Sequence, residues 1–483
     1  MSKKIAVIGA GVGGLAAAAR LASRGHQVEV FEKLPHCGGR NNIIEDQGFK
    51  FDTGPSFVMM PDFFEEVFNY CGRKIGDYLD LRPLEESYRI FYPQGESLSV
   101  FKDSSRTKEE LEKFEKGSSL AFERFVKETA RIYNLVRPLL YECFSLKSLA
   151  NPRLWPLVYK IRALESYWGL ASKYFKSEKL RYAFTFEAMF MGVSPFNAPA
   201  FYSVISYADH VQKIYHAMGG MYKIPKALEK LAGEFGVKFN YSAEVISVRD
   251  NAGLVVVETA DRHKEFDKVV INADYAYAKT ELLNEKIPQY KYSCSVYLLY
   301  LGLKCKVAGL AHHNLFFSSD LKKNLKAIFE DKATALDPSF YVHVPTVTDS
   351  SLAPEGKELF YILVPVPNLE GGAWDIASHE KIIRDNIFDR INKRFNINLQ
   401  ELIEVERKFY PGEFVSRYNI KNGATFGLAH NLMQSAFFRP ANFNPLKNNT
   451  YFVGASTQPG GGLPVVIAGS RIVSDLIEGV RKP

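Results

Sequence analysis

The sequence is poor in cysteine and tryptophan, with five and three among 483 residues. The cysteines are odd in number, lie far apart and include no C-x-x-C pair, so neither a disulfide framework nor a cysteine-based metal site is expected. They are Cys37, Cys71, Cys143, Cys294 and Cys305. We therefore predict a reducing compartment and no bound metal.

The sequence also lacks an apolar run that could span a bilayer. Residues 5–19 follow two lysines as a secretory signal would, but Arg20 and Arg24 close the run without a small-residue cleavage site. The uncharged stretches 188–208 and 448–470 contain Pro and Gly residues that would interrupt a spanning helix. We expect neither to cross a membrane, and we interpret 188–208 as the wall of an apolar tunnel.

Positive charge is concentrated in one part of the chain. The net charge of +7 is matched by residues 131–181 alone, where ten Lys or Arg stand against three Asp or Glu and two of the three tryptophans lie. Basic groups interleaved with aromatic side chains suit a helical surface that rests on anionic lipid headgroups. A solvated helical face above an aromatic core is the alternative. Nucleic acid is not expected as a partner, because no recognition motif accompanies the charge.

The N-terminal residues predict a dinucleotide site. Residues 5–8 are a fully apolar run, typical of a buried parallel strand, and a helical pattern follows over 15–23. Between them Gly9, Gly11 and Gly14 have G-x-G-x-x-G spacing. These glycines allow a tight turn, a close approach of the backbone to a pyrophosphate, and close packing of helix on strand. The phosphates would then lie at a helix N-terminus, which favours negative charge.

A second apolar run, residues 28–31, ends in Glu32, whose carboxylate is placed to accept from ribose hydroxyls. The strand, the glycine spacing and this acid together favour a dinucleotide site over an ordinary glycine-rich turn. Gly38 and Gly39 follow and would again allow close backbone approach, with Arg40 as a phosphate ligand or as a structural arginine in a turn. These residues do not distinguish a nicotinamide from a flavin.

The C-terminal residues favour a flavin. Residues 450–454 read as a short strand, 460–464 as a glycine-rich turn and 465–478 as an amphipathic helix, with Pro464 near its start. The positive end of that helix would stabilise negative charge on the edge of a reduced flavin ring. A nicotinamide enzyme has no obvious need for such an arrangement at its C-terminus.

At this length the chain is too long for one simple core, so two structural regions are expected. Residues 81–217 are mostly helical in pattern, apart from a hairpin at 88–100, whereas 222–274 combine a helix with short strands, as in a return to the first domain. The predicted fold class is α/β, with a Rossmann-like FAD-binding domain that is discontinuous in sequence and an inserted α+β substrate domain containing a helical membrane-associating region. We assign 1–80, 218–290 and 446–483 to the FAD-binding domain, 81–217 to the helical region, and 291–445 to the sheet and helices of the substrate domain.

Further motifs give the chain a family resemblance. It resembles the bacterial and fungal phytoene desaturases, and in places the branch acting on the C30 precursor diapophytoene. Besides the glycine-rich segments, the resemblance lies in Asp52-Thr53-Gly54-Pro55, Phe190-Met191-Gly192-Val193-Ser194-Pro195, His312-His313-Asn314, Tyr341-Val342-His343-Val344-Pro345, residues 349–356 (DSSLAPEG) and residues 454–464 (GASTQPGGGLP). It covers essentially the whole chain.

The resemblance implies an FAD-dependent desaturase that removes a hydride from a lipophilic polyene, of phytoene type (C40) or diapophytoene type (C30). It implies that Glu32 holds the adenosine ribose, that Arg40 lies beside the pyrophosphate or ribityl chain, and that Val245 contacts the adenine. The other implied FAD contacts are Gly9, Gly11, Gly14, Gly38, Gly39, Gly54, Pro55, Gly454, Pro464 and Val465. Gln458 departs from the family pattern, since many relatives have histidine there.

Several alternatives stay open at this stage. A related carotenoid oxidoreductase or isomerase, a flavin amine oxidase, or a non-catalytic membrane-binding flavoprotein could share the cofactor site. The residues Phe186, Met189, Phe190, Phe201 and Tyr202 could line a substrate channel or could be ordinary core. No catalytic base is identified, and His312-His313 is interpreted as a structural pair in a loop rather than a metal site.

The expected location is cytoplasmic, peripherally associated with the inner face of the cell membrane. The number of desaturation steps, the terminal electron acceptor and the oligomeric state are not determined by the sequence.

Overall fold

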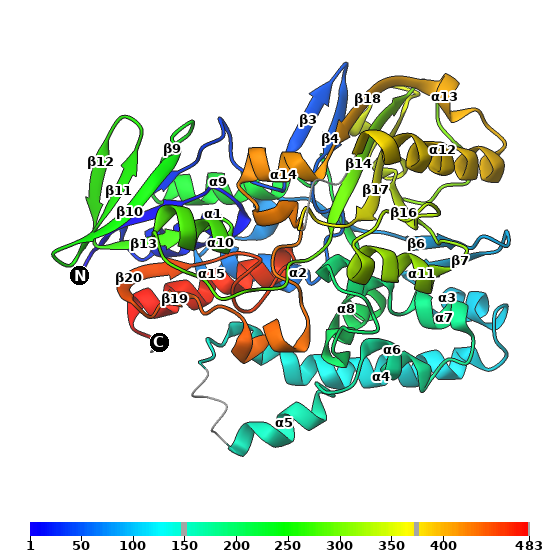
Figure 1. The fold of residues 1–483 in the computed structure, drawn as a ribbon, viewed down its shortest axis with the longest axis horizontal. Coiled ribbons are helices and arrows are strands. Elements are labelled where there is room, and N and C mark those ends of the chain that lie inside the picture. Colours follow the sequence, from blue (N-terminus) through cyan, green and yellow to red (C-terminus); the bar gives the residue numbers. More distant parts are fainter. Residues whose placement is uncertain (146–151, 371–375, 482–483) are drawn as a thin grey trace.

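The structure is a computed structural model that describes residues 1–145, 152–370 and 376–481. A six-stranded sheet contains strands from both ends of the chain. Its order is β19 (Phe443–Asn444), β20 (Lys447–Phe452), β13 (Lys268–Ile271), β1 (Lys4–Ile8), β2 (Gln27–Phe31) and β9 (Lys238–Asn240). All neighbours are parallel except the β19 and β20 pair. Segments more than 400 residues apart therefore share one sheet, with both termini on its side of the molecule (Figure 1).

The two faces of this sheet are covered differently. Ile5 and Val7 of β1 pack toward helices, which are α1 (Val12–Ser23), α2 (Pro61–Tyr70), α9 (Lys223–Glu234) and α15 (Leu463–Glu478). Ala6 and Ile8 pack instead against a three-stranded antiparallel sheet of β10 (Val245–Asn251), β11 (Leu254–Thr259) and β12 (His263–Phe266). The alternation of side chains along β1 explains why its sequence is apolar throughout.

A seven-stranded sheet forms the other half of the molecule (Figure 1). Its order is β18 (Ile403–Phe409), β14 (Ser295–Leu303), β17 (Glu358–Val366), β16 (Phe340–His343), β15 (His313–Phe316), β6 (Glu86–Phe91) and β7 (Ser97–Phe101). Helix α12 (Ile376–Phe395) covers one face with Ile383, Ile387 and Ile391. The opposite face contributes Leu298 and Leu315 to a core shared with the helical region.

The helices between β7 and β8 occupy the lower part of Figure 1, mostly under the seven-stranded sheet. They are α3 (Ser104–Glu112), α4 (Ser118–Val136), α5 (Trp155–Lys160), α6 (Tyr167–Ser172), α7 (Glu178–Ala183) and α8 (Val204–Tyr207). The remaining elements are the hairpin β3 (Ile43–Asp46) and β4 (Phe49–Asp52), the ribbon β5 (Leu81–Pro83) and β8 (Tyr215–Ala217), and helices α10 (Tyr275–Tyr277), α11 (Leu321–Lys326), α13 (Leu399–Leu402) and α14 (Pro411–Tyr418). Among the described residues, no helix combines the length and hydropathy needed to cross a bilayer.

The structure confirms the mixed α/β class with a parallel sheet and corrects details of the sequence interpretation. The first helix begins at Val12 rather than at residue 15, because Gly11 is its N-cap. Within the region predicted to return to the first domain, β10 to β12 form a sheet of their own that packs against the parallel sheet. The hairpin predicted at 88–100 is present as β6 and β7, and it joins the sheet formed by residues 295–409.

The core of the helical region contains a buried carboxyl group. Glu187 is 1% exposed and accepts hydrogen bonds from the Tyr167 hydroxyl and the Ser206 hydroxyl, each at 3.1 Å. Burial raises the pKa of Glu187 from 4.5 to about 7, because no cation compensates its charge there. The folded protein thus keeps a proton on Glu187 that the unfolded chain releases at lower pH.

This difference predicts a pH-dependent effect of Glu187→Gln. Between pH 4.5 and about 7 the folded state binds the extra proton, so ionisation makes folding progressively less favourable, by about 3 kcal/mol once the pH exceeds 7. Gln cannot ionise, so the variant should exceed the wild type in free energy of unfolding at about pH 8 and differ little at about pH 5. Urea unfolding at both pH values measures this, with the exposed Glu65→Gln as control. An equal effect of Glu187→Gln at both values would contradict it.

Candidate cofactor and substrate site

One cavity of about 830 Å³ lies between the parallel sheet and the seven-stranded sheet. It brings together segments from both ends of the chain and from the helical region. Twelve of the thirteen residues predicted to contact the cofactor line it, namely Gly9, Gly11, Glu32, Gly38, Gly39, Arg40, Gly54, Pro55, Val245, Gly454, Pro464 and Val465. The thirteenth, Gly14, lies behind the lining, where a Cβ atom would meet the Gly9 carbonyl oxygen at 2.2 Å. Its role is therefore to let α1 pack on the turn after β1.

Two glycine loops face each other at one end of the cavity. Gly11 and Gly38 form an isolated parallel bridge, and the Gly38 amide donates to the Ala10 carbonyl at 2.9 Å. Gly39 has φ +57°, and a Cβ atom there would lie 3.4 Å from the Gly11 Cα. A cradle of bare backbone at the N-terminus of α1 fits a pyrophosphate, because amide groups of the first helical turn have no partner within the helix.

Glu32 lies at the end of β2, beside this cradle. Its two carboxylate oxygens accept from the Ala10 amide at 2.7 Å and the Leu34 amide at 2.9 Å. Burial raises the pKa of Glu32, while the two amide bonds oppose that rise. Each oxygen keeps a further lone pair, so the carboxylate can also accept from a sugar hydroxyl.

Arg40 crosses from the glycine loop to the far wall. Its Nη1 donates to the Thr425 carbonyl at 2.5 Å. Burial lowers the pKa of Arg40, and the negative charge of Asp274 opposes that shift. Asp274 itself caps α10 by accepting from the Ala276 amide at 3.2 Å. The guanidinium thus carries its charge at the cavity wall with a carboxylate near it.

Asn272 is a site residue that the sequence interpretation did not single out. It follows β13 directly, lines the cavity and donates from Nδ2 to the Gly9 carbonyl at 3.3 Å. Cβ atoms on Gly11 and Gly13 would lie within 2.8 Å of its amide group. Asn272 therefore limits the space around the first glycine loop. In the sequence, its position directly after a strand could have indicated this role.

His430 was also missed, and it connects the C-terminal turn to the helical region. Its Nε2 accepts from the Gly461 amide at 3.0 Å, and its Nδ1 lies 2.8 Å from the Met191 carbonyl. These partners assign the proton to Nδ1, and burial holds the pKa of His430 well below its usual range. No local pattern around His430 indicates such a role.

Gln458, the departure from the family pattern, is held by backbone groups. Its Nε2 donates to the carbonyls of Phe144, Ala436 and Arg439 at 3.0 to 3.1 Å, and its Oε1 accepts from the Phe144 amide at 2.7 Å. The side chain therefore fixes residues 142–145 against the C-terminal loop. All four of these hydrogen bonds are made with backbone groups of the protein.

The rest of the cavity is apolar. Phe186, Met189, Phe201 and Tyr202, four of the five channel candidates, line it together with Leu298 and Leu315 of the seven-stranded sheet. The side chain of Phe190, the fifth, lies outside the described residues. Farther along, the lining consists of Trp155, Leu157, Val158 and Leu164, around α5, and of Met433, Phe437 and Phe438.

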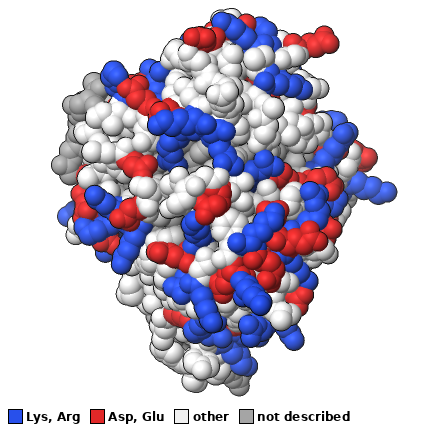
Figure 2. Space-filling model, turned by 90° about the vertical axis from the view of Figure 1, so that its right-hand side faces the viewer, with Lys and Arg blue, Asp and Glu red and all other residues white. Residues whose placement is uncertain are grey.

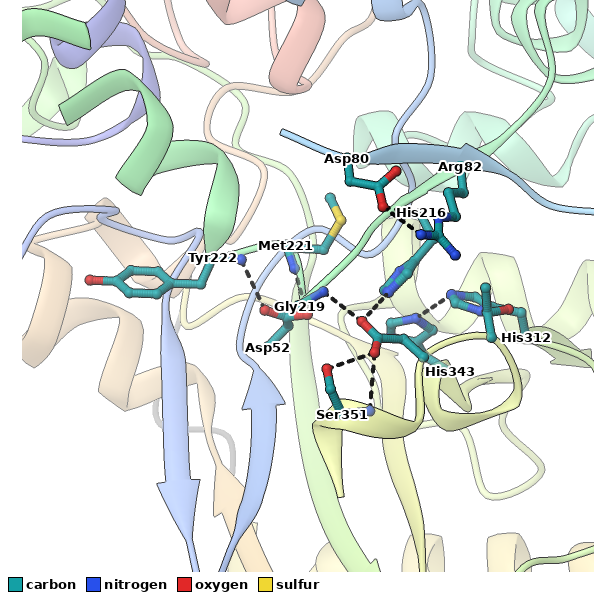
Figure 3. Close-up of polar contacts among 12 residues, drawn as sticks. Asp52, Asp80, Arg82, His216, Gly219, Met221, Tyr222, His312, His343 and Ser351 are labelled. Atoms are coloured by element: carbon teal, nitrogen blue, oxygen red, sulfur yellow. Dashed lines mark hydrogen bonds and ion pairs between the residues drawn. The ribbon is translucent and has the colours of Figure 1, made fainter. Parts of the chain in front are cut away.

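His312 and His313 are both hydrogen-bonded, as expected of structural histidines, but only His312 lies in a loop. His313 is the first residue of β15, and His312 lies beside His216 and His343 in a buried cluster (Figure 3). The sequence interpretation missed this cluster because its members are about 30 to 130 positions apart.

Comparisons with known proteins find similar sequences over nearly the full chain. Residues 12–477 match the family described as flavin containing amine oxidoreductase. A zeta-carotene-forming phytoene desaturase of Myxococcus xanthus is 39% identical, over 98% of this chain and 93% of the relative. A 4,4'-diapophytoene desaturase (4,4'-diapolycopene-forming) of Methylomonas sp is 34% identical, over 99% and 95%. One from Staphylococcus aureus strain Newman (4,4'-diaponeurosporene-forming) is 34% identical, over 99% of both.

Solved structures share the fold at low identity. Putrescine oxidase bound to putrescine has a TM-score of 0.62 at 15% identity, with 99% of each chain covered. An oxidoreductase from Methanosarcina mazei has a TM-score of 0.63 at 18% identity, covering 97% of this chain and 98% of the other.

The chain therefore belongs to the flavin containing amine oxidoreductases and, within them, to the group of phytoene and diapophytoene desaturases. The resemblance read from the sequence motifs is confirmed, as is a flavin cofactor.

The geometry of the glycine cradle predicts the effect of Gly11→Val. A valine side chain would occupy the space between Asn272 and the facing loop, where even a Cβ atom would lie 2.7 Å from the Asn272 Nδ2. The variant should fold and lose flavin on gel filtration, measured as the ratio of flavin to protein absorbance. Gly233→Val in α9, where a Cβ atom meets nothing within 4 Å, is the matched control. A Gly11→Val protein that stays fully loaded would overturn the placement of the pyrophosphate.

Proposed function

We propose that this protein is an FAD-dependent carotenoid desaturase that introduces carbon-carbon double bonds into a C30 or C40 polyene. The observation that carries the proposal is a single cavity with a glycine-rich dinucleotide cradle at one end and an apolar lining at the other. The printed activities of the relatives from Myxococcus, Methylomonas and Staphylococcus support the same substrate class.

The cofactor would be held from both ends of the chain. Gly11, Gly38 and Gly39 would face the pyrophosphate, Glu32 the adenosine ribose and Val245 the adenine. Gly454, Pro464 and Val465 would lie toward the isoalloxazine, at the N-terminus of α15. FAD, when bound, supplies the acceptor for the hydride that desaturation removes from carbon. We also propose the division into a Rossmann-like FAD-binding domain (1–80, 218–290, 446–483) and a substrate domain (81–217, 291–445).

The apolar lining would recognise the substrate by burial. A polyene offers almost no hydrogen-bonding groups, so its position must be set by shape and by apolar contact. Phe201 and Leu315 come from the helical region and the seven-stranded sheet, so the substrate would lie between these two bodies. An apolar wall also keeps water from the reacting carbons.

The outer end of the cavity suits a lipid surface. Trp155, Tyr159 and Leu164 are 60%, 85% and 82% exposed, and Trp155 and Leu164 also line the cavity. Met433, on the neighbouring lining segment, is 66% exposed. Helix α5 lies at the lower edge of the molecule, away from both sheets (Figure 1). We propose that this mouth rests in a bilayer, from which a polyene can enter without crossing water.

Apolar contact contributes more to this membrane proposal than the surplus of basic residues does. Of the eight Lys and Arg of 131–181 whose side chains the structure describes, five form ion pairs, for example Arg137 with Asp62 and Lys179 with Glu96. Arg162 pairs with both Glu128 and Glu165. On the face shown in Figure 2, Lys and Arg are likewise interspersed with Asp and Glu. Paired charges attract anionic lipid weakly.

The proposal predicts the products formed in liposomes. Purified protein with FAD, an electron acceptor and either diapophytoene or phytoene should give polyenes with longer conjugation, detected by chromatography and absorbance. The preferred chain length identifies the substrate. No product from either precursor would contradict the proposal, and peroxide released with putrescine instead would indicate an amine oxidase.

The membrane proposal predicts a loss of vesicle binding that is independent of flavin binding. The triple variant Trp155→Ser, Tyr159→Ser, Leu164→Ser should bind neutral vesicles at least about tenfold more weakly, because three large exposed apolar side chains are removed. Flavin content should not change. Leu446→Ser, which removes a 77% exposed leucine beside β20, is the control. Equal flotation of triple variant, control and wild type would refute the assignment of the mouth.

A further inference from the structure

Three buried histidines meet away from the cofactor cavity. His216 lies in β8, His312 just before β15 and His343 at the end of β16, and each is at most 3% exposed (Figure 3). One ring nitrogen from each lies within 4.8 Å of the others. The Nε2 atoms of His312 and His343 face each other at 2.9 Å.

In two of these rings, the outer nitrogen, which points away from the other histidines, lies within hydrogen-bond distance of an oxygen atom. The Nε2 of His216 lies 3.3 Å from the Asp349 Oδ2, and the Nδ1 of His312 lies 2.8 Å from the Thr348 hydroxyl. If these outer nitrogens carry the protons, the His216 Nδ1 and the His312 Nε2 are left as lone-pair donors. The His216 Nδ1 is buried and has no hydrogen-bond partner among the described residues. A histidine held by a carboxylate on its far nitrogen is the usual arrangement of a metal ligand.

Asp349 is itself fixed in place. Its Oδ2 accepts from the Gly219 amide at 2.5 Å, and its Oδ1 accepts from the Ser351 hydroxyl at 2.6 Å and the Ser351 amide at 3.1 Å (Figure 3). The nearby Arg82 is paired with Asp80 at 2.7 Å, so its positive charge is balanced. The cluster therefore offers a carboxylate held in place beside three converging imidazole nitrogens.

We propose that His216, His312 and His343 bind a zinc ion, with Asp349 as the outer partner of His216. Tetrahedral zinc with Zn–N distances of about 2.0–2.1 Å places its ligand atoms about 3.3–3.4 Å apart. The His312 and His343 nitrogens would separate by about half an ångström, and the His216 ring would move inward. A water molecule would complete the coordination.

The ion would have a structural role. His216 belongs to the β5 and β8 ribbon, while His343 belongs to the seven-stranded sheet, so zinc would cross-link two parts of the fold. The zinc ion would lie behind the residues that line the cavity, separated from the cavity by one layer of side chains. His313 stacks on Phe57 at a centroid distance of 3.9 Å, and its Nδ1 lies 2.6 Å from the Tyr341 hydroxyl. Phe57 and Tyr341 line the cavity.

A second buried group with similar spacing, Glu187, Asp209 and His210, does not favour a metal. Burial raises the pKa of both of its carboxyl groups, so they retain protons that a metal would have to displace. In the histidine cluster only the proton between the Nε2 atoms of His312 and His343 would have to be displaced.

Metal analysis of the FAD-loaded full chain, freed of any affinity tag, tests the proposal. Protein produced with added zinc should contain about one zinc ion per chain, and X-ray absorption at the zinc edge should show histidine nitrogens at about 2.0–2.1 Å. Removal of zinc with a chelator should lower the thermal midpoint, and zinc alone should restore it. Wild-type protein that takes up no zinc after chelation would overturn the proposal, whatever the behaviour of the variants.

Variants locate the ion. His312→Gln combined with His343→Gln should abolish zinc uptake, and Asp349→Asn should weaken it about 10–100-fold. His313→Gln, a buried neighbour outside the trio, is the matched control and should keep the zinc. Zinc retained by the double variant, or lost equally in His313→Gln, would show that the ion binds elsewhere and would refute the assignment.

Discussion

The close approach of the first glycine turn to the C-terminal helix is the constraint on which the rest of the structure depends. A Cβ atom on Gly13 would lie 2.7 Å from Val466 of α15, so a side chain there would push the helix away. Arg20 of α1 donates to the Ser470 hydroxyl at 3.1 Å, and Lys3 donates to the Ile477 carbonyl at 2.5 Å. Because the chain ends are joined in this way, the residues between them must form insertions that leave and re-enter the same sheet.

That arrangement produces the site. The N-terminal cradle and the glycine turn before α15 line one cavity, and His430 ties the second to the helical region through Met191. The helical region is thus positioned against the C-terminal glycine turn by contacts at the cavity itself. A change in the C-terminal glycine turn would therefore alter both the glycine-rich end and the apolar end of the cavity.

The sequence predicted the parts of this structure that local patterns encode. The apolar run before Gly9, the acid at the end of the second strand and the C-terminal turn all lie where their spacing indicated, because strand and helix periodicities are local properties. Contacts between distant segments could not be predicted from such local patterns. Asn272 and His430 act through contacts with Gly9 and Gly461, and the His216 cluster forms only when β8 meets β16. The pairing of charges could not be predicted from composition either, as for Arg162, which forms ion pairs with two carboxylates.

The central claim is that a polyene in the apolar part of the cavity donates its hydride to a flavin held in the glycine cradle. Anaerobic mixing of the FAD-loaded protein with diapophytoene or phytoene in liposomes, followed by absorbance, tests it most directly. The account predicts that the flavin bleaches while a more conjugated polyene appears in equal amount. A flavin that stays oxidised with both polyenes, yet is reduced by dithionite, would contradict it.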